Sequence, residues 1–309
     1  MKRSYVLALA CALCAAPAAR PAEQDDEVAR LQATVRESQG FFVVHHEPYL
    51  IKTDIDARTA AEAALYMRRF HDAFRSFIKP EPKLDATPVV YLFKDRATYQ
   101  KAVRKRGHLQ LAQAGGGYAG TDDRSELFTY QSHPGKGFAA YPKDVLRHEG
   151  AHQLLAYVLG GQRIPVWYDE GVATFFEGWQ VEKSVDQNLK RLRLVHPAFP
   201  RIRKTYGTPK FKDLIYLMNL THRTWVPDEY GDVTAQHYAE VESFMTFLLL
   251  SPKGRRFFAA LFKVIGRGKD PVHVLSGPAI RNAQKAWYKD IERRIEIYDK
   301  LRAGERRPR

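Results

Sequence analysis

The chain has 309 residues, of which 45% are hydrophobic and 27% are charged. This length and balance suit one large domain, or two modest lobes, with a sizeable core, and they exclude wholesale disorder. The formal net charge of +14 allows attraction to an anionic partner such as an envelope surface, but a solvated basic surface is the preferred interpretation.

The first 22 residues have the pattern of an export signal peptide. Lys2 and Arg3 precede an apolar, alanine-rich run over residues 5–16, and small residues follow. The run is too short for a good transmembrane helix, so we expect an exported mature chain, periplasmic or secreted, with no transmembrane segment. An uncleaved anchor, or lipidation at Cys11, is the alternative interpretation.

Both cysteines of the chain, Cys11 and Cys14, lie in this signal segment. The mature protein would therefore contain no thiol, which excludes cysteine zinc ligands and cysteine nucleophiles. It would also need no disulfide, although its compartment would allow one.

Alternating strand and helix patterns fill the first part of the chain. We expect an N-terminal helical segment over residues 23–40, with its helix at 25–39, and then an α+β lobe over 41–160. Apolar runs, helical spacing and turn residues predict the elements of that lobe. They are strands at 41–44, 49–51 and 88–93, helices at 60–77 and 96–106, and a sheet-edge hairpin formed by 115–118 and 125–130.

The rest of the chain reads as helices alone, in an α lobe over residues 161–302 followed by a basic tail over 303–309. We expect helices at 144–159, 169–179, 235–250, 255–265 and 279–301. The fold class is therefore α+β: a lobe with a mixed β-sheet, followed by an all-helical lobe, with the helix at 144–159 on the seam between them.

That seam helix carries His148, Glu149 and His152. Two histidines four residues apart share one helical face, so their imidazoles can hold one metal ion, and zinc suits neutral imidazole. The carboxylate of Glu149 can reach a water on the metal and act as general base. The alternative is a helix that contains two histidines by coincidence.

A second acidic helix follows after a short return. Pro165 prevents the chain from re-entering a helix, and Glu170 then opens the next one. A helix, a tight return and a second helix can bring this carboxylate back against the histidine pair. Two histidines, one carboxylate and an open position make a catalytic zinc site. Alternatively, Glu170 is an acid favoured by the helix dipole in a first turn.

These motifs resemble the gluzincin clan of zinc metallopeptidases, in the peptidase MA-like superfamily. The resemblance rests on His148-Glu149-x-x-His152 and on Trp167-x-x-Glu170-Gly171-x-Ala173-x-x-x-Glu177. The whole mature chain also resembles a poorly characterised bacterial family of predicted exported gluzincins. The resemblance implies a zincin-like fold, one Zn²⁺ per chain on His148, His152 and Glu170, and Glu149 as base and proton shuttle.

Three further residues gain expected roles beside the zinc. Glu177 lies two turns after Glu170, so it could steady a ligand from outside, or it could be a surface acid. Tyr238 lies where gluzincins place a phenol that stabilises the oxyanion, and His237 is the alternative donor. Either one could instead be a core or capping residue.

The motif is similar in particular to the aminopeptidase type of gluzincin, with its Glu-Gly-x-Ala helix, but part of the aminopeptidase pattern is missing. No segment matches the one that binds a substrate N-terminus, and the nearest counterpart, Gly115 to Tyr118, lacks the acid. Exopeptidase action is therefore in doubt. Gly116, Gly117 and Tyr118 at the sheet edge could still pair with an extended substrate by strand addition.

We therefore expect a zinc-dependent protease acting on a peptide or protein substrate. The alternative is a catalytically weak or inactive binding protein of the cell envelope on a zincin scaffold. Nucleic acid is not expected as a partner, because the chain has no recognisable aromatic-basic pattern or binding fold.

Overall fold

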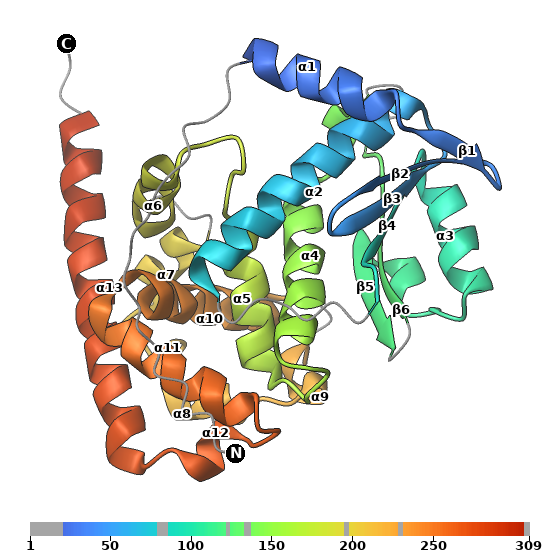
Figure 1. The fold of residues 1–309 in the computed structure, drawn as a ribbon. Coiled ribbons are helices and arrows are strands. Elements are labelled where there is room, and N and C mark those ends of the chain that lie inside the picture. Colours follow the sequence, from blue (N-terminus) through green and yellow to red (C-terminus); the bar gives the residue numbers. More distant parts are fainter. Residues whose placement is uncertain are drawn as a thin grey trace, which may run out of the picture.

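A computed structural model describes residues 21–78, 86–121, 124–132, 137–194, 198–227 and 231–305 (Figure 1). Most of the expected export signal, residues 1–20, lies outside this range. So do residues 122 and 123, at the turn of the expected hairpin, and residues 306–309 of the expected basic tail. None of the helices in the described ranges combines the length and apolar character needed to cross a membrane.

One mixed sheet of six strands forms the N-terminal part of the molecule, with the strand order β1-β2-β3-β4-β6-β5. The parallel pairs are β3 with β4 and β4 with β6, and the other neighbours are antiparallel. The expected strands and edge hairpin are confirmed, since β5 ends the order. The strands are β1 (Arg36–Ser38), β2 (Phe41–His46), β3 (Tyr49–Thr53), β4 (Val89–Phe93), β5 (Gly116–Thr121) and β6 (Arg124–Tyr130).

The helix expected over residues 25–39 is wrong at its C-terminal end. Helix α1 (Pro21–Gln32) ends early, and residues 36–38 form β1 instead, so segment 23–40 is not one helix. Gln39 and Gly40 have φ values of 51° and 78°. Two consecutive positive φ angles are what a type I′ hairpin turn requires, so this pair reverses the chain into β2.

Strand alternation divides the sheet between two helical layers. In β4, Val90 and Leu92 join the main core beneath α2 (Ala57–Phe77) and α4 (Lys143–Val158), whereas Tyr91 and Phe93 belong to a smaller core. This smaller core packs under α3 (Arg96–Lys105). Both faces of the central strand are thus buried, as expected for a strand read as a continuous apolar run.

The C-terminal half is helical in every described element, which confirms the α+β class. Its longer helices are α5 (Val166–Glu177), α10 (Asp232–Leu250), α11 (Pro252–Ile265) and α13 (Gly277–Glu305). Helix α13 takes up the first residues of the expected tail. The shorter helices are α6 (Val185–Leu194), α7 (Phe199–Thr205), α8 (Leu214–Met218), α9 (His222–Trp225) and α12 (Pro271–Val274), and 3-10 turns lie at Leu111–Gln113 and Gly137–Ala140.

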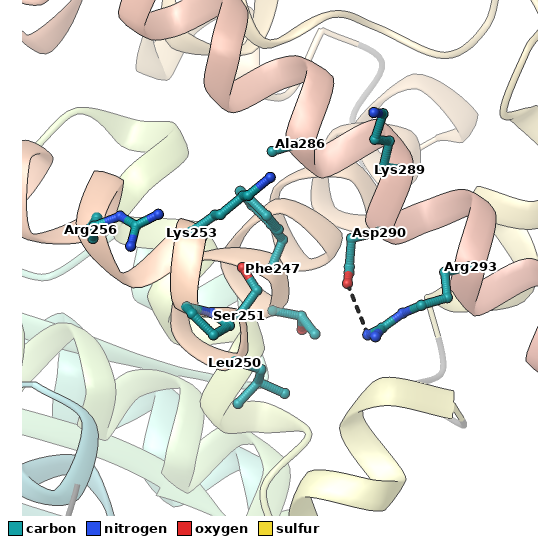
Figure 2. Close-up of a pocket in the computed structure, with 11 residues that line it drawn as sticks. Phe247, Leu250, Ser251, Lys253, Arg256, Ala286, Lys289, Asp290 and Arg293 are labelled. Carbon is teal, nitrogen blue, oxygen red and sulfur yellow. Dashed lines mark hydrogen bonds and ion pairs between the residues drawn. The ribbon is translucent and has the colours of Figure 1, made fainter.

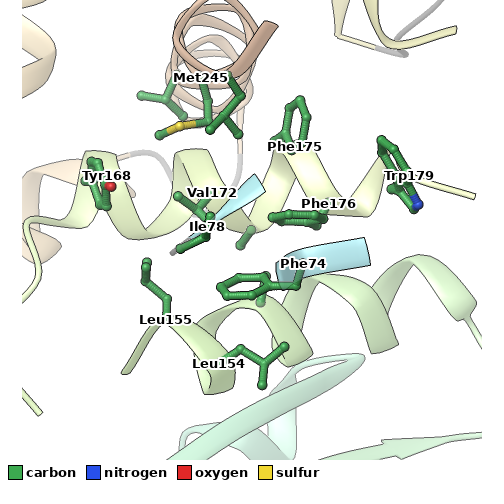
Figure 3. Packing of buried hydrophobic residues seen from close by; sticks show 14 of the residues in the cluster. Phe74, Ile78, Leu154, Leu155, Tyr168, Val172, Phe175, Phe176, Trp179 and Met245 are labelled. Carbon is green, nitrogen blue, oxygen red and sulfur yellow. The ribbon is translucent and has the colours of Figure 1, made fainter. Parts of the chain in front are cut away.

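Helix α5 lies at the centre of the main core, between α4 and α10 and beside the end of α2 (Figure 3). Phe176 packs on Phe74 of α2, with ring centroids 5.1 Å apart. A Cβ atom on Gly171 would lie 3.2 Å from the Met245 side chain and 3.4 Å from the Val241 carbonyl oxygen. The missing side chain at Gly171 therefore allows α5 and α10 to approach closely.

Candidate metal centre

The two motif histidines lie together on α4. His148 and His152 are one turn apart, and their ring centroids are separated by 4.9 Å. Helix α4 contacts the sheet on one side and α5 on the other, so it lies between the strands and the helical half. The i, i+4 spacing therefore gives the geometry that the sequence predicts.

Glu170 faces this pair from α5. Helix α5 begins at Val166, directly after Pro165, so Glu170 lies in its second turn and does not open the helix as expected. Its Oε2 atom lies 3.4 Å from His148 Nε2 and 3.9 Å from His152 Nε2. The three ligand atoms all lie within 4.8 Å of one another.

Burial and charge act against each other at these three side chains. Burial lowers the pKa of His148, but hydrogen bonds to Glu170 and Glu177 outweigh it and hold the pKa well above its usual value. Burial also lowers the pKa of His152, yet Asp169 and then Glu170 raise it to about 9. Burial raises the pKa of Glu170, but the histidines and a hydrogen bond from Tyr238 lower it overall. These carboxylates would favour any cation held between the rings.

A second pair of carboxylates holds the histidines from outside. Glu177 Oε2 lies 3.1 Å from His148 Nδ1, and Asp169 Oδ1 lies 2.7 Å from His152 Nδ1. With Nδ1 of each ring occupied in this way, Nε2 of each ring is left to face Glu170. Carboxylates in this arrangement fix the orientation of metal-binding imidazoles. Glu177 lies where its spacing predicts, whereas sequence reasoning did not assign Asp169 to the site.

Glu149 is half-buried and is not one of the three clustered ligands among the described residues. Its charge contributes to the raised pKa of Tyr99, after burial, and to the raised pKa of His148. Tyr99 lies on α3, so Glu149 lies on the side of the site nearer the sheet. This placement is compatible with a base that acts beside a metal without binding it.

The two candidate oxyanion donors have different surroundings. The phenol of Tyr238 hydrogen-bonds to Glu170, and its ring packs on Trp225 at a centroid distance of 5.1 Å. His237 is fully buried, with Nδ1 at 3.0 Å from the Trp225 carbonyl oxygen and Nε2 at 3.3 Å from the Tyr216 hydroxyl. The contacts of Tyr238 favour it over His237 as the group facing the site.

The edge strand β5 runs beside α4, and it carries Gly116, Gly117 and Tyr118. It pairs with β6 on one side only, because it is the last strand of the sheet. Burial raises the pKa of Tyr118, a hydrogen bond with Ser125 partly offsets this rise, and the negative charge of Asp169 adds to it. The edge strand and the outer carboxylate of His152 are therefore close in space.

Two buried residues of α4 hydrogen-bond to neighbouring elements and so hold this helix in position. Gln153 donates from Nε2 to the Ser125 carbonyl oxygen at 3.1 Å and to its Oγ at 2.9 Å, which ties α4 to β6. Arg147 donates to the carbonyl oxygens of Phe176 and Glu177 at the C-terminal end of α5. A cation is favourable at a helix C-terminus, so Arg147 holds the two ligand-bearing helices together.

Two comparisons with known proteins were made by sequence. No protein-family model matches the chain, and a search of curated proteins found no match. A function for the chain therefore rests on its own residues and on their arrangement.

Proposed function

We propose that this protein is a zinc-dependent peptide hydrolase of the gluzincin type with a zincin-like fold. One observation carries the proposal: two imidazole Nε2 atoms and one carboxylate oxygen converge, while each Nδ1 is held by a separate carboxylate. Sets of two histidines and one carboxylate are typical of catalytic zinc, which keeps a position open for water or substrate.

The chemistry of the three donors fits zinc. Glu170 Oε2 is buried and, apart from its long contacts with the two imidazoles, has no hydrogen-bond donor among the residues in the described ranges. A buried carboxylate oxygen without a donor is costly unless a cation satisfies it. The side chains of the three ligands are nonetheless between 13% and 18% exposed. A substrate could therefore reach them.

Zinc on these ligands would supply Lewis acidity, which polarises a peptide carbonyl and makes a water acidic. The chain's own residues would do the rest. Glu149 would accept the proton that the attacking water loses and pass it to the leaving amine. The Tyr238 phenol would donate a hydrogen bond to the carbonyl oxygen as negative charge develops on it.

The substrate would be a peptide in extended conformation. The outer edge of β5 offers backbone groups to such a chain by strand addition. Residues Gly116, Gly117 and Tyr118 are its candidate positions, and the strand lies beside α4. Binding of this kind recognises the backbone, so it supports cleavage within a polypeptide.

Metal content and cleavage can be tested together. The full mature chain, purified without chelators and supplied with zinc, is expected to hold about one zinc per chain by elemental analysis. It is also expected to cleave a fluorogenic casein, to lose that activity with 1,10-phenanthroline, and to regain it with zinc. Absence of zinc would overturn the proposal. Bound zinc without hydrolysis would favour the inactive envelope-binding alternative.

Replacing Asp169 should weaken zinc binding without removing a ligand. In Asp169→Asn, the partner of His152 Nδ1 loses its charge, so the imidazole is held less firmly and is a weaker base. We expect zinc affinity to fall by about 10–100-fold, measured by competition with a fluorescent chelator. Asp186→Asn, an exposed acid on α6, is the matched control. Equal affinity in both variants would remove Asp169 from the site.

Removing one hydroxyl group tests the oxyanion role. Tyr238→Phe should lower kcat by roughly a hundredfold with little change in KM, because the donor acts mainly in the transition state. Zinc content should stay at the wild-type level. Tyr216→Phe, which removes the phenol bonded to His237, is the control and should retain full turnover. Full turnover in Tyr238→Phe would transfer the role to His237 or to no side chain.

A further inference from the structure

A pocket of about 520 Å³ lies between the C-terminal end of α10, the first turns of α11 and the middle of α13. Its volume falls in the range of small-molecule sites. Tyr238 and Leu250 are twelve residues apart on α10, which corresponds to about 18 Å along the helix. The pocket is therefore separate from the candidate metal centre, and a ligand bound in it would not depend on the proposed function.

The inner part of the pocket is apolar. Phe247 and Leu250 come from the last turns of α10, and Ala286 faces them from α13 (Figure 2). The two α10 side chains are mostly buried in the main core, so they form a fixed surface. Such a surface favours an apolar ligand group over water.

The rim of the pocket is cationic. Lys253 and Arg256 lie on α11, and Lys289 and Arg293 lie on α13 (Figure 2). Asp290 is the one acid in the lining. Its Oδ1 lies 3.4 Å from Arg293 Nη2 and its Oδ2 lies 4.0 Å from Arg294 Nη1, so its charge is already balanced.

The remaining three cations face the pocket without such a partner. Lys253, Arg256 and Lys289 form no ion pair with any residue in the ranges that the structure describes. Helix α10 ends here and α11 begins here, so the opposite charges of their dipoles offset each other and the positive charge of the rim comes from these side chains. An anionic group at this position would thus meet uncompensated positive charge from two helices.

The corner between α10 and α11 fixes the shape of the pocket. Ser251 caps α11 by accepting from Gly254 N at 2.8 Å. A Cβ atom on Gly254 would overlap the Phe247 carbonyl oxygen, so the two helices are in backbone contact there. A preformed pocket of this kind binds a ligand without a large ordering cost.

We infer that this pocket binds a small anionic amphiphile, with a phosphate or carboxylate head at the cationic rim and an apolar body against Phe247 and Leu250. The head would contact Lys253, Arg256 and Lys289. Both parts are needed: the rim alone attracts any anion, and the apolar surface alone attracts any hydrocarbon. The shared chemistry covers lipid-derived phosphates and fatty acids.

Four probes separate head from tail, each used below its micelle concentration: octyl phosphate, octanoate, inorganic phosphate and octyl glucoside. Calorimetry on the full chain should give octyl phosphate or octanoate a Kd at least about tenfold below that of inorganic phosphate, because the tail buries apolar area. Octyl glucoside should bind at least about tenfold more weakly than the tighter of the two anions. Which anion binds more tightly identifies the head group.

Charge-matched double variants locate the site. Arg256→Gln with Lys289→Gln should weaken binding of the tighter anion about tenfold. Lys263→Gln with Lys285→Gln removes the same charge from the same two helices outside the pocket lining, and should leave Kd within about twofold. Ala286→Phe should fill the apolar part and weaken both octyl probes while leaving inorganic phosphate unchanged. Thermal unfolding checks that each variant is folded.

Several results would overturn the inference. Binding of octyl glucoside equal to that of the octyl anions would make the site merely apolar. Equal losses in the two double variants would indicate diffuse attraction to the basic surface. Absence of binding by both octyl anions to the folded wild-type chain would exclude the ligand class.

Discussion

Glu149→Gln is expected to keep zinc and fold while peptide hydrolysis falls by about 10²–10⁴-fold, the typical contribution of general acid–base catalysis. Glutamine has nearly the same shape as glutamate but cannot accept the proton of the attacking water. Glu149 is not one of the three clustered ligands among the described residues, so its replacement should spare the metal. The measurements are kcat/KM on a fluorogenic peptide and the zinc-to-protein ratio.

A matched control keeps this result interpretable. Glu182→Gln removes a carboxylate whose Oε1 lies 3.3 Å from Lys143 Nζ. Lys143 is on α4, as Glu149 is, but neither Glu182 nor Lys143 is one of the clustered ligands. The Glu182→Gln variant should hydrolyse the peptide at the wild-type rate. Loss of zinc in Glu149→Gln would instead make Glu149 structural. Unchanged hydrolysis with zinc bound would exclude it as the base.

His152→Ala is expected to lose the metal altogether. It removes one of three ligands and leaves Asp169 without its imidazole partner. Zinc at about 1,000 times its Kd should stabilise the wild-type fold by about 4 kcal/mol, because it binds only the folded chain. The His152→Ala variant should gain no stability from added zinc. Thermal unfolding with and without zinc, together with elemental analysis, measures both effects.

His222→Ala is the matched control for the loss of an imidazole. His222 is exposed on α9 and is not among the clustered ligands. This variant should bind zinc and be stabilised by it as the wild type is. An equal zinc-dependent gain in His152→Ala would show that His152 is not a ligand.

The sequence predicts most of the site because its geometry is mainly local. Helical periodicity alone brings His148 beside His152, and a helix-breaking return at Pro165 allows a second helix to fold back with Glu170. Strand alternation likewise predicts the sheet, since β4 reads as an apolar run between two helical layers. These inferences need only residue spacing and the ordinary geometry of each element.

What the sequence does not predict depends on how elements pack. Whether Asp169 or another acid reaches His152 depends on the tilt of α5 against α4, which spacing does not define. The same holds for the choice between Tyr238 and His237, since neighbouring helical residues point in different directions. The hairpin of β1 and β2, which takes the place of the end of the expected helix, contains a turn with positive φ at Gln39, a non-glycine residue that gives a weak signal.

The enclosure of α5 has a consequence for how an ion would be held. Helix α5 is packed on several sides, by α4 and α10 and by aromatic side chains of α2. Such a helix opens only when the whole domain opens, so its amide protons should be among the slowest to exchange with solvent. The backbone that carries Glu170 is therefore ordered before any ion arrives. In small zinc-dependent domains, much of the metal's binding energy is consumed in folding the chain. Here folding would not consume that binding free energy, so it would appear in full as affinity for the ion. Removal of the ion would leave the protein folded.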